Sequence, residues 1–323
     1  MTTKPVTKFF LDSCDPMQTI EAIESLNKIN VNLDGQTTNP SLLVKNPLLQ
    51  MQLHGGKIHE QALLDFYKQE IQAISNLIPE GSVSIEVYAD ENSTKDDLLK
   101  QAHEFYTWIP NAHIKFPTIK AGIEAAQEFV NGGGRVNMTL VFSQEQALAV
   151  HIATKNMKNP GDVLLSPFVG RFDDIGLNGT DFIANVVKMY KELGSQVSIL
   201  SASLRSLDHL EKCIELGSTL TTGPLSIYQE YVQKQLELNS LKSELGNSPS
   251  LQEGGSSIPN LASPRQRGGS EADGVVFSNN QLQPIPYRQL NLSETNWKNL
   301  NIHHDLTDKG LAKFVADWKS VLL

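Results

Sequence analysis

Residues 132–142, GGGRVNMTLVF, and residues 143–154, SQEQALAVHIAT, together decide the fold. The three glycines predict a turn, and the apolar run that follows them predicts a short strand. Ser143 then stands where a helix begins, and serine is a favoured N-cap residue because its hydroxyl accepts a hydrogen bond from a free backbone N–H. A strand followed at once by a helix is the repeating unit of proteins built on parallel sheets.

The same unit recurs along residues 8–240. Its eight predicted strands are KFFLDS (8–13), VNLDGQTT (31–38), SVSIEVYAD (82–90), AHIKFP (112–117), the strand of 132–142, DVLLSPFVG (162–170), QVSILSASLR (196–205) and STLTTGP (218–224). Strands that alternate with helices pair in parallel through right-handed crossovers. Eight units in this length favour a closed (β/α)₈ barrel, an α/β fold of the TIM type, over an open doubly wound sheet.

Composition narrows the class of partner. The 323 residues are 40% hydrophobic and 20% charged, with a formal net charge of −9. Such an acidic balance argues against nucleic acid and anionic membranes as partners, whereas a few local arginines can still bind a small phosphate. The first residues lack a signal-peptide h-region, and no apolar run approaches the roughly 18 residues of a membrane span. With only Cys14 and Cys213, we expect a cytoplasmic protein with reduced thiols.

The chain changes character near residue 241. About half of residues 242–274 are Gly, Ser or Pro, so this stretch cannot bury enough surface to offset its ordering entropy. We therefore expect a barrel domain over 1–240, a low-complexity loop or linker over 241–275, and a C-terminal segment over 276–323. Residues 306–323 form an amphipathic pattern, which predicts a helix that packs back on the barrel, over its mouth.

Polar residues gather at the predicted strand ends. In barrels of this kind the chemistry lies at the carboxyl ends of the strands. Many polar groups on one rim call for a functional explanation, because burying them is costly. The residues in question are Asp12, Asp34, Asn39, Glu86, Lys115, Asn137, Thr139, Ser166, Arg171, Ser203, Arg205, Thr221 and Thr222.

Lys115 is the most informative of these residues, because Ile114 and Phe116 flank it in a short buried strand. Its stem could run to water at an edge of the sheet. Alternatively, it is buried so that it can lose its proton: desolvation and a nearby arginine would lower a pKa that is ordinarily about 10.4. A neutral lysine beside carboxylates and arginines suggests imine chemistry on a phosphorylated carbonyl compound.

Competing chemistries have weaker signals. The chain has no GxxxxGK[ST] loop, and GGGR (132–135) lacks the strand-then-helix context of a dinucleotide site. The eight histidines offer no cluster at a strand end, so we expect neither a metal nor a cofactor. Cys14 has no identifiable base and is interpreted as a small packed residue.

Five segments, in order, resemble those of transaldolases. They are DGQTTNPSLL (34–43), HIKFPTIKAGIEAA (113–126), NMTLVFS (137–143), SPFVGR (166–171) and SASLR (201–205). The resemblance covers residues 8–240, and the tail WKNLNIHHDLTDKGLAKFVADW (297–318) is also similar to the C-terminal sequence of the family. The resemblance implies a transferase of carbohydrate metabolism that acts in the pentose phosphate pathway. Such an enzyme forms a Schiff base with phosphorylated sugars and needs no cofactor. The resemblance is also compatible with a homodimer.

The resemblance also implies roles for individual residues. Lys115 would form the imine with the ketose, and Asp12 would take the proton of the C4 hydroxyl as the C3–C4 bond breaks. Glu86 and Thr139 would hold a water for imine formation and hydrolysis. The implied substrate-binding residues, for the hydroxyls and the phosphate, are Asn39, Asn137, Ser166, Phe168, Arg171, Ser203 and Arg205.

Two departures and two alternatives accompany this interpretation. Thr118 stands one position earlier than the family's threonine, whose place Ile119 takes, and the low-complexity insert is not part of the family core.

The first alternative is a fructose-6-phosphate aldolase-like enzyme. It shares much of the site but tends to have glutamine at the position of Glu86 and tyrosine at that of Phe168. The other alternative is a sugar-phosphate-binding barrel without turnover.

Overall fold

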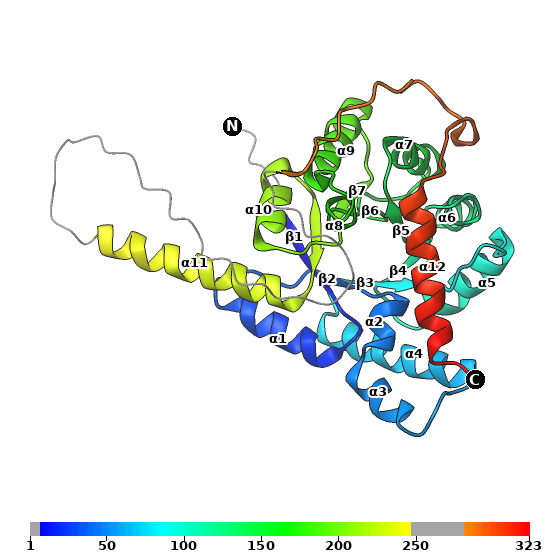
Figure 1. Cartoon of the computed structure of the whole chain (residues 1–323), viewed down its shortest axis with the longest axis horizontal. Helices are drawn as coiled ribbons and strands as arrows, with labels where there is room; N and C mark the ends of the chain where they lie inside the picture. Colours follow the sequence, from blue (N-terminus) through cyan, green and yellow to red (C-terminus); the bar gives the residue numbers. More distant parts are fainter. Residues whose placement is uncertain (1–6, 247–280) are drawn as a thin grey trace.

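A computed structural model describes residues 7–246 and 281–323. Eight parallel strands close into a barrel in sequence order, and β1 pairs with both β2 and β8. The predicted (β/α)₈ barrel is therefore confirmed (Figure 1). The strands are β1 (Lys8–Asp12), β2 (Gly35–Thr37), β3 (Ser82–Glu86), β4 (Ala112–Pro117), β5 (Val136–Val141), β6 (Val163–Pro167), β7 (Ser198–Ser201) and β8 (Leu220–Gly223).

Helices surround this barrel and extend beyond its last strand. They are α1 (Pro16–Asn27), α2 (Pro40–Val44), α3 (Pro47–Leu53), α4 (Glu60–Leu77), α5 (Lys95–Tyr106), α6 (Lys120–Asn131), α7 (Gln144–Ala153), α8 (Gly170–Asp173), α9 (Gly179–Leu193), α10 (Leu207–Leu216), α11 (Leu225–Gly246), the 3₁₀ helix η2 (Trp297–Asn299) and α12 (Asp305–Ser320). No helix within the described ranges is both long and apolar enough to cross a membrane.

Several loops after the strands begin a helix with a side-chain cap. Ser143 caps α7 as predicted, and Gln146 completes a capping box by accepting from the Ser143 backbone N–H. Asp15 caps α1, and Asn39 caps α2 by accepting from the N–H of Leu42 at 2.9 Å. Asp15, Asn39 and Ser143, which follow β1, β2 and β5, are thus fixed by the helices that start there.

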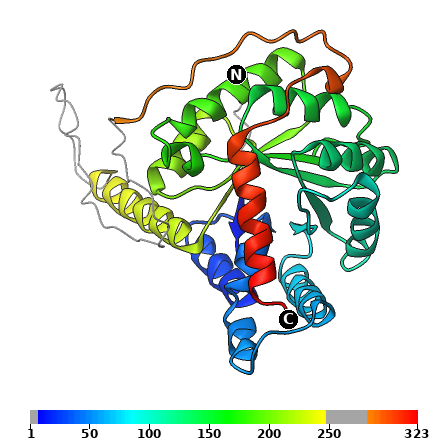
Figure 2. The same ribbon diagram turned by 45° about the vertical axis from the view of Figure 1, so that its right-hand side comes forward.

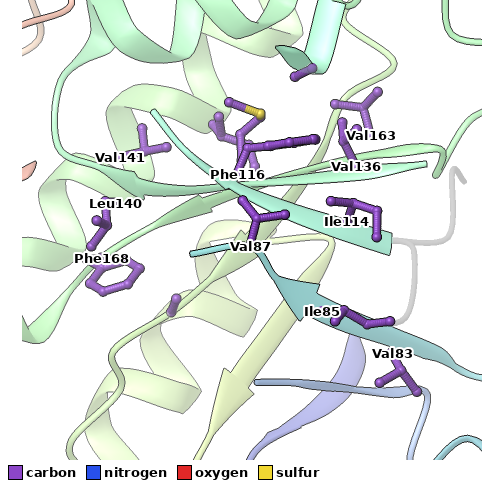
Figure 3. Packing of buried hydrophobic residues seen from close by; sticks show 14 of the residues in the cluster. Val83, Ile85, Val87, Ile114, Phe116, Val136, Leu140, Val141, Val163 and Phe168 are labelled. Carbon is purple, nitrogen blue, oxygen red and sulfur yellow. The ribbon is translucent and has the colours of Figure 1, made fainter. Parts of the chain in front are cut away.

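The apolar core lies mainly between the strands and the helices. In Figure 3 Ile114 and Phe116 lie in this layer, and both are fully buried. Because successive side chains of a strand point to opposite faces, Lys115 between them points into the barrel.

A second, smaller cluster fills the barrel interior: Phe10, Leu164, Leu200 and Leu220. Two positions after Phe10, Leu164 and Leu220, the same strand faces carry the polar residues Asp12, Ser166 and Thr222. The apolar layer therefore lies beneath the polar one. Gly35 makes room for it, because a Cβ at that position would come within 2.5 Å of the Phe10 ring.

The second strand differs from its prediction. Asp34 was expected at the carboxyl end of that strand, and this is wrong, because β2 is only three residues long and starts after Asp34. The Asp34 carboxylate instead accepts from the Phe9 N–H at 2.9 Å, near the amino ends of β1 and β2. Asp34 therefore serves strand pairing, away from the polar rim.

Helix α12 lies across the mouth of the barrel (Figure 2) and contacts α2 and β5. Thr307 at its start donates to the carbonyl of Leu140 at 2.9 Å and accepts from Gln146 Nε2, also at 2.9 Å. The predicted linker begins inside α11, which continues to Gly246. The rest of the predicted linker, residues 247–275, lies outside the described residues.

Candidate active site

A cavity of about 240 Å³ opens at the carboxyl ends of the strands. Five basic side chains and one carboxylate, that of Asp12, belong to its wall, although the chain carries a net charge of −9. The lining residues are Asp12, Thr37, Asn39, Ser41, Leu42, Lys45, Lys115, Thr139, Ser166, Phe168, Arg171, Ala202, Ser203, Arg205, Thr222, Lys313 and Phe314. A cavity with this excess of positive charge suits an anionic ligand.

Lys115 lies at the inner end of this cavity. Its ammonium is 2.9 Å from Glu86 Oε2 and donates to the carbonyl of Thr38 at 3.0 Å. The Lys115 and Glu86 side chains are 4% and 3% exposed. The lysine is therefore buried, and its stem does not run to the outer surface.

Glu86 lies behind Lys115 at the end of β3. Burial raises the pKa of Glu86 to about 7; the charge of Lys115 opposes this shift, and the nearby carboxylate of Asp12 adds to it. A carboxyl group with a pKa near neutral exchanges its proton at physiological pH, as general acid–base chemistry requires.

Asp12 is the second carboxylate near the lysine. Burial raises its pKa, whereas the charge of Lys115 and a hydrogen bond from Thr37 oppose the increase. The Thr37 hydroxyl donates to Asp12 Oδ1 at 2.8 Å. Because the Thr37 hydroxyl donates its only proton to Asp12, it accepts a hydrogen bond from the Thr222 hydroxyl, 2.7 Å away. These hydroxyls fix the orientation of the carboxylate.

Tyr67 of α4 supports the lysine from outside the barrel. Its hydroxyl accepts the backbone N–H of Glu86 at 3.0 Å and contacts the Thr38 hydroxyl at 2.5 Å. Because Thr38 donates its own proton to the Ser84 carbonyl, Tyr67 is the donor to Thr38. The tyrosine thus links both residues that contact the Lys115 ammonium. Sequence reasoning missed it, because one tyrosine on an amphipathic helix looks like any core aromatic.

Thr139 and Asn137 come from β5 and have different surroundings. The Thr139 hydroxyl is fully buried, lines the cavity and has no hydrogen-bond partner among residues 7–246 and 281–323. Asn137 uses both ends of its amide: it donates to Ser84 at 3.0 Å and accepts from Ser166 at 2.7 Å. Thr139 is therefore free to bind a ligand or a water, whereas Asn137 positions Ser166.

The two arginines enter the cavity from neighbouring elements. Arg171 is in α8, and Arg205 follows β7 and forms a two-pronged ion pair with Asp174. Burial and the charge of Arg205 lower the pKa of Arg171. Gly170 allows this close packing, because a Cβ there would lie 2.5 Å from Arg205 Nε. Two guanidinium groups side by side form a natural phosphate site.

Ser203 and Phe168 complete this side of the wall. Ser203 has a φ of 58°, a left-handed conformation that is strained for a residue with a side chain, and its carbonyl accepts from the Gly170 N–H at 3.0 Å. The Phe168 ring packs edge-on against Phe142, with centroids 5.5 Å apart. It presents an apolar face to the cavity, without a hydroxyl.

Sequence reasoning missed one side of the cavity. Ser41, Leu42 and Lys45 come from α2 and the turn after it, and Lys313 and Phe314 come from α12. They were missed because none of them stands at the end of a strand: four lie on helices, and Lys45 follows α2. Thr118, whose role the sequence leaves open, donates its hydroxyl to the Thr139 carbonyl at 2.7 Å. It holds β4 to β5 and does not line the cavity.

In the described part of the chain, no group of three or more His, Cys, Asp or Glu side chains is arranged to hold a metal ion. The candidate site is therefore built from a lysine, two carboxylates, hydroxyls and a cationic wall.

Comparison with known proteins identifies relatives of the whole barrel. The family model described as Transaldolase/Fructose-6-phosphate aldolase matches residues 9–323. A "Probable transaldolase" of Dehalococcoides mccartyi is 34% identical over 229 residues, covering 71% of this chain and 92% of that relative. Another, of Parabacteroides distasonis, is 34% identical over 240 residues, covering 74% and 97%. A third, of Phocaeicola vulgatus, is 36% identical over 219 residues, covering 68% and 87%.

Proposed function

We propose, since this chain belongs to the transaldolase/fructose-6-phosphate aldolase family, that it is a transaldolase of the pentose phosphate pathway. It would transfer a dihydroxyacetone unit from fructose 6-phosphate or sedoheptulose 7-phosphate to erythrose 4-phosphate or glyceraldehyde 3-phosphate. The observation that carries this proposal is the buried Lys115, 2.9 Å from Glu86, at the inner end of a cavity with an excess of basic side chains.

The proposed reaction starts when the neutral amine of Lys115 attacks the ketose carbonyl and water leaves, which forms the imine. Asp12 then takes the proton of the C4 hydroxyl while the C3–C4 bond breaks, and the aldose departs. The three-carbon enamine that stays on Lys115 attacks the carbonyl of the acceptor aldose. Water adds to the new imine, releases the product ketose and restores the lysine.

Glu86 and Thr139 are proposed to hold the water of the imine steps. A carboxyl group with a pKa of about 7 and a buried, unpartnered hydroxyl on the cavity wall support this role. Asn39 and Ser166, the latter positioned by Asn137, would bind the hydroxyls of the three-carbon unit. Side chains proposed to bind the phosphate are Arg171, Ser203 and Arg205.

A fructose-6-phosphate aldolase is the second candidate, because the family contains both activities. The Phe168 ring favours transfer: a tyrosine hydroxyl at this place could protonate the enamine and release free dihydroxyacetone, whereas a phenyl ring cannot. Glu86 also favours transfer, because the aldolase tends to have glutamine at this position.

One assay separates the candidates: glyceraldehyde 3-phosphate release from fructose 6-phosphate, with and without erythrose 4-phosphate. Sustained release that requires the acceptor supports transfer, and equal release without it supports the aldolase. No release in either case would favour a binding protein without turnover.

A second experiment tests the imine. Borohydride reduction in the presence of fructose 6-phosphate should add the three-carbon unit to Lys115, and Lys115→Ala should abolish both labelling and activity. Full activity in Lys115→Ala would contradict the imine mechanism.

A further inference from the structure

Helix α12 brings a basic residue, Lys313, into the cavity wall that also contains Arg171 and Arg205. The Lys313 ammonium donates to Asp317 Oδ1 at 2.5 Å, one helical turn further along α12. The second oxygen of Asp317 accepts from the Ser41 hydroxyl of α2. The carboxylate thus joins the two helices that form this side of the mouth.

An exposed ion pair four residues apart on a helix is common and usually stabilises little. This pair differs from that ordinary case in its surroundings. The Asp317 side chain is only 17% exposed, whereas that of Lys313 is 56% exposed and free to change rotamer. The Asp317 charge also reaches Arg171, where it acts to raise the pKa against the effects of burial and of Arg205. Because Lys313 lines the same cavity as Arg171 and Arg205, this pair belongs to the wall that carries the arginines.

The arginine side of the cavity is organised in the same way. Arg205 is paired with Asp174, whose side chain is 35% exposed, much as Lys313 is paired with Asp317. A phosphate dianion that enters between these pairs competes with both carboxylates for the cations. Lys313 has a flexible four-carbon stem with three donors, so it can exchange a carboxylate for a phosphate oxygen without moving the helix.

We propose that Lys313 is a third cation of the phosphate subsite, supplied by the C-terminal helix and held by Asp317 while no anion is bound. This inference rests on the proposed function in that the substrate is taken to be a phosphate ester. It assigns to α12 a direct part in substrate recognition, in addition to its packing over the barrel mouth.

The test is direct titration of the intact protein with inorganic phosphate by calorimetry, which needs no turnover. Lys313→Met should weaken phosphate binding about three- to tenfold, in line with the loss of one charge-assisted hydrogen bond that is partly open to water. Lys313→Arg should restore most of the affinity. Lys309→Met is the matched control: Lys309 is exposed on the same helix and is not part of the cavity wall, so this variant should bind like the wild type.

Asp317→Asn should have the opposite effect. The amide oxygen can still accept from Ser41, but the competing charge is gone, so phosphate should bind severalfold more tightly. In the transfer assay, Lys313→Met should raise KM for fructose 6-phosphate by the same factor with little change in kcat.

Equal phosphate affinity of the wild type and Lys313→Met would overturn the inference and leave the proposed function intact. It would also be overturned if the wild type turned over fructose 6-phosphate but bound no phosphate at millimolar concentration. Absence of turnover, with the Lys313 effect on phosphate binding preserved, would contradict the transaldolase instead. The thermal unfolding midpoints of the variants and the wild type are compared as a control, to separate an effect on binding from an effect on folding.

Discussion

Lys115 and Glu86 form a buried pair 2.9 Å apart, in which burial raises the pKa of the Glu86 carboxyl to about 7. Breaking such a pair by removing one partner is costly, because the remaining charge lacks water and has lost its partner. The Thr38 carbonyl, held through Tyr67, gives the ammonium a further acceptor at 3.0 Å. The arrangement keeps the lysine in place whether Glu86 is charged or neutral, which is useful if Glu86 changes protonation during each turnover.

Glu86 predicts the pH dependence of the reaction. Burial raises its pKa from the ordinary 4.5 to about 7, so the carboxylate that would accept the proton of the water forms as pH rises through about 7. We expect kcat/KM to rise with pH across this range. Glu86→Gln should lose this limb, and its kcat should fall about 10²- to 10⁴-fold, as for loss of a general acid–base group.

Stability gives an independent check on Glu86. Because its folded pKa is raised, its contribution to the free energy of unfolding is fully present below about pH 4.5 and is lost as pH rises through about 7. Comparing urea unfolding of the wild type and Glu86→Gln from pH 4.5 to 8 should reveal this difference. If the rise of kcat/KM with pH persisted unchanged in Glu86→Gln, that rise would come from the titration of another group. Asp12 would be the first to examine.

At the residue scale, the sequence could predict the groups that stand on strands. Lys115 and Glu86 were recognisable because each is a charged residue between apolar residues of a strand. The apolar neighbours point to the helices, so the charged side chain points into the barrel. Tyr67 was not, because its contact with Glu86 depends on how α4 packs against β3, and no pattern within α4 encodes that distance.

The helix that follows the lysine strand begins without a side-chain cap. Ile119 is the N-cap of α6, with φ −109° and ψ 169°, and its side chain makes no cap hydrogen bond. Ser143 at the start of α7 and Thr94 at the start of α5 both make one. The position where the family resemblance leads one to expect threonine is thus a cap position, and Ile119 leaves N–H groups of the first turn without this partner.

Ile119→Thr should therefore stabilise the protein relative to Ile119→Val. The two variants have nearly the same shape, so loss of apolar contact is similar in both, and only threonine supplies a hydroxyl to the free N–H groups. We expect a difference in the free energy of unfolding of about 1 kcal/mol in favour of threonine. Chemical denaturation of both variants measures it. If valine were equal or better, the first turn of α6 would not need this cap.

At the element scale, the sequence predicted the alternation of strands and helices better than their ends. The capped start of α7 could be predicted because serine, glutamine and the apolar run stand at fixed spacing. The short β2 could not, since apolar and polar residues alternate only in the first half of the predicted strand, VNLD, whereas pairing with β1 and β3 places the strand at Gly35–Thr37. Asp34 was misplaced for this reason.

The closure of the barrel mouth brings the C-terminal helix α12 against α2 and β5. Helix α12 meets the end of β5, where Leu140 adopts a φ of 59° and its carbonyl accepts from Thr307. The amphipathic stripe of α12 predicts that it packs on something. It does not predict which strand, because contact between residues 167 positions apart depends on the whole fold. The cavity residues that come from α12 were missed on the same account.

Gly310 tests this closure, because it is the point of close approach. A Cβ there would lie 2.6 Å from Leu140 Cδ2, so Gly310→Val must displace either the leucine or the helix. Overpacking of this kind costs about 1–3 kcal/mol of stability. Valine has a better helix propensity than glycine, so local preference alone would give the opposite sign. Because Lys313 and Phe314 follow within about one turn, a displaced helix should also raise KM for fructose 6-phosphate.

The matched control is Ala312→Val, at an exposed position of the same helix. It places the same valine side chain at an exposed position and should leave stability within about 0.5 kcal/mol of the wild type, as at most surface sites. Urea unfolding and KM measured on both variants separate the two effects. If Gly310→Val were as stable as Ala312→Val and had an unchanged KM, then α12 would not be held in one position over the mouth. Its residues would then not form a fixed wall of the cavity, and the third cation proposed for the phosphate subsite would have no fixed place from which to act.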